Sequence, residues 1–190
     1  SHIYTILSYP WLVRKEFPKA QIMIGGGAFT AFADQLIEKL PEGTIGLLGE
    51  GEDAILKVIE GRSIEDERYI IKEGNAVRKG NQGSPALLDA QTVDLPYLTS
   101  IFPQYREYQN ESIGVQTKRG CKYSCAYCSY PTIEGNRLRY RDSTEVIREI
   151  ELLCRQFAAR YIFFTDAVFN DPDDHYLQIA EELIRAENRT

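Results

Sequence analysis

The chain has 190 residues, of which 43% are hydrophobic and 26% are charged; this balance is ordinary for a folded protein and excludes global disorder. Its formal net charge of −6 disfavours a general nucleic-acid-binding surface, because such surfaces are normally basic. No apolar run approaches the ~20 residues that span a bilayer, and the first residues lack the layout of a secretory signal. Four cysteines, three of them clustered, do not resemble an extracellular disulfide framework, so we expect a cytoplasmic protein.

The first 62 residues alternate predicted helices and strands. "YPWLVRKEFPKA" favours a helix, and "AQIMIGGG" favours a buried strand that runs into a glycine turn. "FTAFADQLIEKLPEG" predicts a helix with one apolar stripe formed by Phe32, Leu36, Ile37 and Leu40. "TIGLLGEGEDAILKVIEG" then repeats the plan of strand, glycine turn and helix. This rhythm is typical of a doubly wound α/β domain, and residues 1–62 are long enough for only part of one.

Residues 63–110 have a different character. "RYIIKEGNAVRKG" predicts a β-hairpin whose turn lies near Glu73, Gly74 and Asn75. "NQGSPALLDAQTVDLPYLTSIFPQY" is rich in turn-forming residues and has no sustained periodicity. We therefore interpret residues 63–110 as a linker with a hairpin, which wraps over a neighbouring domain.

The β/α alternation resumes in residues 111–190. "SIGVQTK" and "RYIFFTD" predict two strands, and "PDDHYLQIAEELIRAE" begins a helix. Asp142 or Ser143 can cap another helix between these strands. The apolar stripe of that helix comprises Val146, Ile147, Ile150, Leu153, Cys154 and Phe157. A complete eight-unit barrel takes about 250 residues, so this region would supply about two βα units, and we expect the chain to be an excerpt of a longer protein.

A short loop concentrates the thiols of the chain. "KRGCKYSCAYCSYPTIEGNR", residues 118–137, contains Cys121, Cys125 and Cys128. Thiolates at this spacing can converge on one inorganic centre, and four of them normally complete a [4Fe–4S] site. Three thiolates leave one iron open, as catalytic metal sites do and structural sites do not.

The segment from Arg119 to Cys128 resembles the cluster loop of radical S-adenosylmethionine (SAM) enzymes, including the aromatic Tyr127 before the last cysteine. The resemblance implies that Cys121, Cys125 and Cys128 hold three irons of a [4Fe–4S] cluster. It implies that the amino and carboxylate groups of SAM chelate the fourth iron. Electron transfer from the cluster would then cleave SAM into methionine and a 5′-deoxyadenosyl radical, which abstracts a hydrogen from the substrate.

The same resemblance implies residues that bind SAM. Tyr127 would lie against the adenine, and Thr165 and Asp166 would approach the amino group from the end of the second strand. The usual Gly-Gly-Glu of the family is replaced there by Phe-Thr-Asp. Arg141 would bind the SAM carboxylate, since guanidinium groups bind carboxylates in bidentate fashion. It is one of six basic residues expected to offset the negative charge of the cluster: Lys118, Arg119, Lys122, Arg137, Arg139 and Arg141. In an extended segment, Arg139 and Arg141 point to the same side.

The upstream half looks like the later part of the cobalamin-binding domain of cobalamin-dependent radical SAM enzymes. The residues that carry this likeness, and that would bind cobalamin, are Gly25, Gly26, Gly27, Gly49 and Glu50. A backbone without Cβ permits close approach of a ligand. The Asp-x-His-x-x-Gly motif of that family is absent. The expected fold is α/β: a partial Rossmann-like (flavodoxin-like, cobalamin-binding-type) domain in residues 1–62, and the first βα units of a partial TIM-type radical SAM barrel in residues 111–190.

The resemblance thus implies a radical SAM enzyme that catalyses methyl transfer or a radical rearrangement, with cobalamin carrying the methyl group where it is bound. Its cofactors would be a [4Fe–4S] cluster, SAM and, in that case, cobalamin. Its partners would be a small-molecule substrate and an electron donor such as flavodoxin or ferredoxin, and neither a membrane nor a nucleic acid. The chain itself is expected to be inactive, because its barrel is incomplete.

Two alternatives remain open. A transfer-RNA methylthiotransferase has a similar cluster loop, but that family carries three further cysteines upstream, and residues 1–120 contain none. A non-catalytic zinc-binding module would recruit Cys154 or His175 as a fourth ligand. A buried hydrophobic role is the commoner one for a cysteine on an apolar helix stripe, as at Cys154. A disulfide is the weakest alternative, because three cysteines cannot all pair among themselves.

Overall fold

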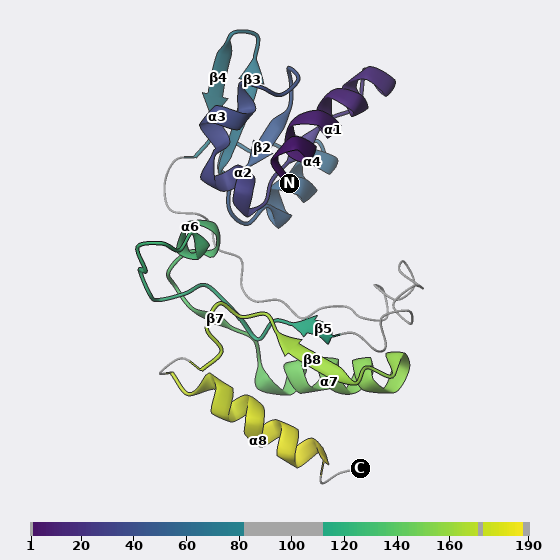
Figure 1. Cartoon of the computed structure of the whole chain (residues 1–190), viewed down its shortest axis with the longest axis vertical. Helices are drawn as coiled ribbons and strands as arrows, with labels where there is room; N and C mark the ends of the chain where they lie inside the picture. Colours follow the sequence, from purple (N-terminus) through teal and green to yellow (C-terminus); the bar gives the residue numbers. More distant parts are fainter. Residues whose placement is uncertain (1, 82–111, 171–172, 188–190) are drawn as a thin grey trace. The chain divides into compact units, whose positions relative to one another are not determined.

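The computed structural model describes residues 2–81, 112–170 and 173–187 (Figure 1). The chain divides into two units, Ser1–Leu87 with Tyr123–Asn136, and Leu88–Lys122 with Arg137–Thr190. Most of the predicted linker lies outside the described residues. No helix within the three described ranges is long and apolar enough to cross a membrane. The domain ranges drawn from the sequence stay a prediction.

The first unit is built on a four-stranded sheet of order β1-β2-β3-β4 (Figure 1). The strands are β1 (Met23–Ile24), β2 (Ile45–Leu47), β3 (Tyr69–Glu73) and β4 (Ala76–Lys79). β1 and β2 are parallel, whereas β3 pairs antiparallel with both β2 and β4. The predicted hairpin is confirmed, with Gly74 at its turn in the left-handed region (φ 61°). Because β3 also pairs with β2, the hairpin is part of this sheet.

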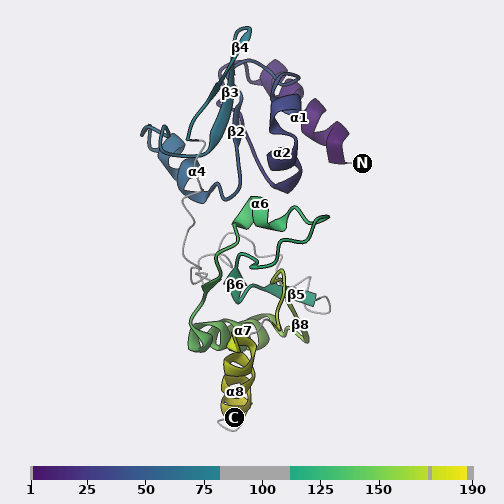
Figure 2. The same cartoon turned by 90° about the vertical axis from the view of Figure 1, so that its left-hand side faces the viewer.

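Helices cover both faces of the sheet. They are α1 (His2–Glu16), α2 (Gly27–Ala31), α3 (Ala33–Ile37) and α4 (Glu52–Ile59). α1, α2 and α3 pack with Ile70 on one face, while α4 packs with Tyr69 on the other, as the alternation along a strand requires. Figure 2 shows the sheet between α2 and α4. A short helix, α6 (Tyr130–Glu134), also belongs to this unit.

The helix predicted after the first glycine turn is broken at Phe32. Phe32 has φ −128° and ψ 28° and ends α2, and its ring is 56% exposed, so its predicted place in the core is wrong. Phe29 is fully buried instead. Its ring fills the space beside Gly46, where an added Cβ would lie 2.3 Å from the ring. The other predicted core residues of this helix, Leu36, Ile37 and Leu40, are buried.

The second unit contains a βαβ arrangement, in which β5 (Ser112–Val115) pairs parallel with β8 (Tyr161–Phe164). Between them in sequence are the antiparallel pair β6 (Lys118–Arg119) and β7 (Arg139–Tyr140), and then α7 (Ser143–Phe157). The final helix is α8 (His175–Glu187). Asp142 caps α7 as predicted, by accepting hydrogen bonds from the N–H groups of Thr144 and Glu145. The hydroxyl of Thr144 also donates to this carboxylate. This hydrogen bond first, and the two N–H bonds after it, hold the pKa of Asp142 below its usual range.

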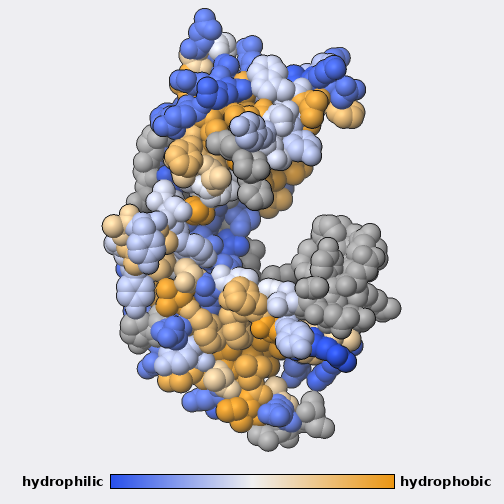
Figure 3. All heavy atoms as spheres, viewed as in Figure 1, coloured by the Kyte–Doolittle hydropathy of each residue, from blue (hydrophilic) through white to orange (hydrophobic). Residues whose placement is uncertain are grey.

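The core of the second unit is formed by one face of the β5–β8 pair together with α7 and α8. The predicted stripe of α7 is buried at Val146, Ile147, Ile150, Leu153 and Phe157. Cys154 is exposed, which corrects its predicted place on the stripe; at the last turns of α7 the core reaches only Leu153 and Phe157. β8 leaves Tyr161 and Phe163 on its other face more than 60% exposed. Figure 3 shows apolar side chains gathered on the surface of this unit.

Candidate functional site

The four cysteines are free thiols. Cys121 belongs to the second unit and is buried, whereas Cys125 and Cys128 belong to the first unit and are exposed. The N–H of Cys128 donates to the carbonyl oxygen of Cys125 at 3.0 Å and closes a turn. Tyr127, within this turn, is 92% exposed. Reduced thiols in an eight-residue segment are the donor chemistry that an iron–sulfur cluster needs.

The two candidates for a fourth zinc ligand differ in exposure. Cys154 is exposed on α7 and His175 is buried at the start of α8. In the part of the chain that the structure describes, no three side chains of His, Cys, Asp or Glu converge in a metal-binding geometry. Which donors share a centre therefore stays a prediction from the sequence.

Asp166 organises the backbone that leads into the cysteine loop. Its carboxylate accepts hydrogen bonds from the N–H of Thr117 (2.7 Å), the hydroxyl of Thr117 (2.6 Å) and the N–H of Lys118 (3.2 Å). Both Thr117 and Lys118 are buried, four and three residues before Cys121, respectively. The residue predicted to contact SAM thus ties the end of β8 to the start of the loop. The sequence offered no signal for Thr117, which lies 49 positions away from Asp166.

Lys118 is a buried cation beside this carboxylate. It is 2% exposed, and its ammonium donates to the carbonyl oxygen of Phe169 at 2.9 Å and lies 5.9 Å from the centroid of the Tyr140 ring. Burial lowers the pKa of Lys118, while the charge of Asp166 acts in the opposite direction. The ammonium group of Lys118 thus lies inside the second unit, on a residue only three positions before Cys121.

A second set of polar side chains joins Lys122, in the loop, to Tyr140 and Asp173, which come after it. Tyr140 donates its hydroxyl to Asp173 at 2.7 Å, and Lys122 approaches the other oxygen of Asp173 at 3.2 Å. The Tyr140 hydroxyl and the Lys122 ammonium hold the pKa of Asp173 below its usual range. Burial raises the pKa of Tyr140 well above its usual value. The ring of His175 lies 4.7 Å from that of Tyr140, and burial lowers the pKa of His175.

Arg139, in β7, and Arg141, directly after it, are both buried, whereas Tyr140 between them is exposed, as expected if the two arginines point to the same side. Arg141 donates to the carbonyl oxygen of Gln116 at 2.7 Å and forms an ion pair with Glu149 at 2.5 Å. Glu149, which the sequence did not single out, is also buried. The guanidinium expected to bind the SAM carboxylate therefore binds an internal one. Thr165, also predicted to contact SAM, is exposed and donates its N–H to the carbonyl oxygen of Val115 at 3.0 Å.

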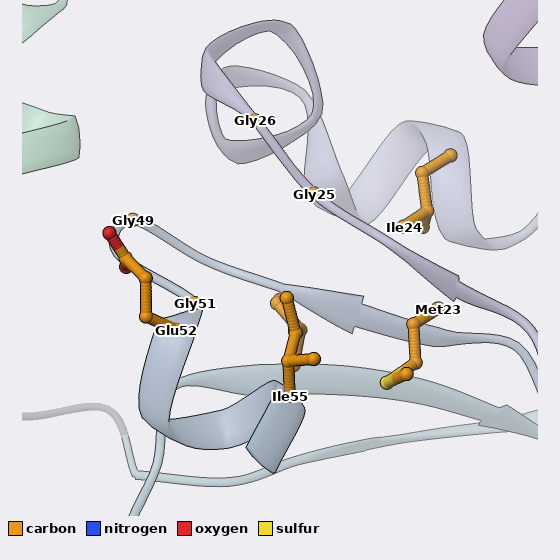
Figure 4. Close-up of a pocket in the computed structure, with 9 residues that line it drawn as sticks. Met23, Ile24, Gly25, Gly26, Gly49, Gly51, Glu52 and Ile55 are labelled. Atoms are coloured by element: carbon orange, nitrogen blue, oxygen red, sulfur yellow. The ribbon is translucent and has the colours of Figure 1, made fainter. Parts of the chain in front are cut away.

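A pocket of about 330 Å³ in the first unit lies at the carboxyl ends of the parallel strands β1 and β2 (Figure 4). Open α/β sheets bind ligands at this edge. The lining residues are Met23, Ile24, Gly25, Gly26, Leu47, Gly49, Gly51, Glu52 and Ile55. Gly25, Gly26 and Gly49 are among the residues predicted to bind cobalamin, whereas Gly27 and Glu50 are not part of the lining.

The pocket combines bare backbone with one carboxylate. Gly26 (φ 90°) and Gly49 (φ 77°) adopt the left-handed conformation that other residues rarely adopt, so the two turns depend on glycine. Figure 4 shows the glycines at the strand ends, with Met23 and Ile55 below them and Glu52 at the start of α4. The pocket therefore suits a ligand that approaches the backbone closely.

One family model matches the C-terminal part of the chain. Residues 115–190 match the family model described as "Radical SAM superfamily". This segment is therefore similar to part of a radical SAM domain.

Two curated relatives cover most of this chain. The cobalamin-dependent radical SAM methyltransferase TokK of Streptomyces tokunonensis is 28% identical over 92% of this chain and 27% of TokK. The ribosomal protein uS12 methylthiotransferase RimO of Crocosphaera subtropica is 27% identical over 87% of this chain and 34% of RimO. The chain thus spans about a third or less of the length of these relatives.

A solved structure shares the fold. The radical SAM methyltransferase TsrM of Kitasatospora setae, with a tryptophan substrate and a SAM analogue bound, has a TM-score of 0.74 at 21% identity. The match covers 100% of this chain and 37% of TsrM. At this identity the likeness concerns the fold, and it supports a mixed α/β architecture like that of cobalamin-dependent radical SAM enzymes.

Proposed function

We propose that the chain is part of a cobalamin-dependent radical SAM enzyme. The observation that carries the proposal is the order of two features along one chain. A glycine-lined pocket at the ends of two parallel strands comes first. Three free thiols follow, near the start of the segment that matches the radical SAM family model. TokK, which is similar over 92% of this chain, is named as a cobalamin-dependent radical SAM methyltransferase.

The fold supports this arrangement. β1 and β2 are parallel, with helices on both faces of their sheet, as in a partial Rossmann-like domain. In the second unit, β5 and β8 are parallel and bury one face under α7 and α8. Their other face is open, as expected for strands whose inner side would face the interior of a TIM-type barrel.

In this proposal, Cys121, Cys125 and Cys128 supply three thiolates to a [4Fe–4S] cluster, which when bound would reduce SAM to methionine and a 5′-deoxyadenosyl radical. Asp166 holds the backbone that enters the loop. Lys118, buried three residues before Cys121, would contribute a positive charge that offsets the negative charge of a bound cluster. Tyr127 is exposed and free to stack on an adenine.

The pocket is the proposed cobalamin site, and cobalamin, when bound, would carry a methyl group. Gly25, Gly26 and Gly49 would let one end of the corrinoid approach the backbone. We propose methyl transfer or a radical rearrangement of a small molecule as the reaction of the whole protein, with flavodoxin or ferredoxin as the electron donor.

A methylthiotransferase is the second candidate, and the similarity to RimO is the observation that favours it. Residues 1–120 contain no cysteine, so they offer no thiolates for the second iron–sulfur cluster that a methylthiotransferase would hold upstream. The first proposal also assigns a ligand to the glycine-lined pocket. We therefore rank the methylthiotransferase second.

Single replacements of Cys121, Cys125 and Cys128 by alanine test the proposed cluster. After anaerobic reconstitution, each variant is expected to hold at least about fivefold less iron than the unmodified chain, since three thiolates are the minimum for this site. Cys154→Ala is the matched control, because Cys154 is an exposed free thiol on α7. It should retain the iron content and the brown colour. Equal loss in all four variants, or in none, would contradict the assignment.

A further inference from the structure

The helix that follows the cysteines sits against the glycine turns of the first unit. α6 begins two residues after Cys128 and packs against α2. A Cβ added to Gly27 would lie 2.8 Å from Cδ1 of Ile133, and one added to Gly49 would lie 2.9 Å from the carbonyl oxygen of Ile133. Real Cβ atoms do not approach other atoms so closely. At Gly49 the neighbouring atom belongs to the backbone, so this position requires glycine, whereas a side chain at Gly27 would force the end of the Ile133 side chain to turn away.

This contact gives a role to Gly27, which the pocket does not explain. Gly27 was predicted to bind cobalamin, but it is not in the pocket lining. Gly49 has two roles, because it lines the pocket and also meets Ile133. Its N–H donates to the hydroxyl of Thr30 in α2 at 3.0 Å, which joins the second glycine turn to the helix after the first. The two turns and Ile133 thus form one packed group.

The packed group is connected to the thiols through short hydrogen-bonded turns. The N–H of Cys128 donates to the carbonyl oxygen of Cys125, and the N–H of Thr132 donates to that of Ser129, both at 3.0 Å. Few flexible residues therefore separate Ile133 from either cysteine. A shift of Ile133 would therefore displace the segment that carries these two thiols.

We propose that Ile133 is a positioning residue. Its packing against Gly27 and Gly49, here called its seat, fixes the part of the cysteine loop that carries Cys125 and Cys128. Because Gly49 also borders the pocket, the geometry of the pocket and that of the two thiols are linked. The part of this inference that concerns a cluster rests on the proposed function. The seat itself does not.

The test is a size exchange across the contact. Gly27→Val adds three carbons where Ile133 lies, and Ile133→Ala removes three, so the double variant restores the volume. In the full chain without metal, hydrogen exchange at the amides of Cys128 and Thr132 is expected to become about tenfold faster in each single variant. The double variant should recover most of the protection. Ile59→Ala removes the same atoms from a side chain that is 70% exposed, and should leave exchange unchanged.

A second readout concerns the cluster. In the reconstituted chain, Gly27→Val and Ile133→Ala should change the electron paramagnetic resonance spectrum of the reduced cluster, and the double variant should restore it. If the unmodified chain takes up no cluster, the proposed function fails, while the exchange data still decide on the seat. Unchanged exchange and an unchanged spectrum in both single variants would overturn the inference. Should Gly27→Val fail to fold, Ile133→Ala, which only opens a space, decides alone.

Discussion

Replacement of Arg141 by methionine is expected to lower the free energy of unfolding of the second unit by about 3–5 kcal/mol, the usual cost of leaving one member of a buried ion pair without its partner. The side chains of Arg141 and Glu149 are 4% and 7% exposed, and their charged groups are 2.5 Å apart. Methionine fills much of the space of the arginine stem but cannot compensate the carboxylate. Urea-induced unfolding followed by far-ultraviolet circular dichroism measures the change.

The matched control removes both charges. In Arg141→Met/Glu149→Leu, no buried charge is left alone, and stability is expected to return to within about 1 kcal/mol of the unmodified chain. The carbonyl oxygen of Gln116 still loses its donor in the double variant, which accounts for a small remaining cost. Equal destabilisation of the single and double variants would show that arginine acts through its shape and not through its pairing with Glu149.

Replacement of Asp166 by alanine is expected to have the second largest effect. It leaves two backbone N–H groups and one hydroxyl without their acceptor, all from residues that are at most 2% exposed. Buried donors without partners cost about 1–3 kcal/mol each. Some of the donors will find water after a local rearrangement, so we expect a total loss of about 2–4 kcal/mol. Thermal unfolding measures this loss, and iron content after reconstitution should fall with it.

Asp166→Asn separates the positioning role from general stability. An amide oxygen can still accept from the N–H groups of Thr117 and Lys118, and its NH₂ group can donate to the Thr117 hydroxyl. Asn should therefore recover more than half of the lost stability and a spectrum of the reduced cluster close to that of the unmodified chain. Alanine should broaden or shift that spectrum even in the fraction that retains iron. An unaltered spectrum in Asp166→Ala would refute the positioning role.

Local patterns predicted the elements of this fold well. The periodicity of α7, its cap at Asp142 and the hairpin turn at Gly74 are properties of neighbouring residues, and all three are confirmed. Phe32 shows the limit of such patterns. Two phenylalanines three residues apart both fit the stripe, and the absence of a side chain at Gly46, in another element, decides that Phe29 enters the core.

The candidate site shows the same division. The cysteine loop was found from the sequence because its three thiols lie within eight residues. The partners of Asp166 and Arg141 were not found, because their selection depends on contacts between residues far apart in the chain. A carboxylate at a strand end and an arginine beside a predicted anion both suggested SAM, yet each binds a buried group of the protein itself. Whether either also contacts SAM stays a prediction.

The central claim is that Cys121, Cys125 and Cys128 hold one [4Fe–4S] cluster. Iron, sulfide and zinc content, determined on one anaerobically reconstituted sample of the unmodified chain, tests it most directly. We predict a brown protein with about four irons and four sulfides per chain. A colourless protein with one zinc per chain and no sulfide would contradict the claim, because a closed structural zinc site would then be the correct interpretation of the loop.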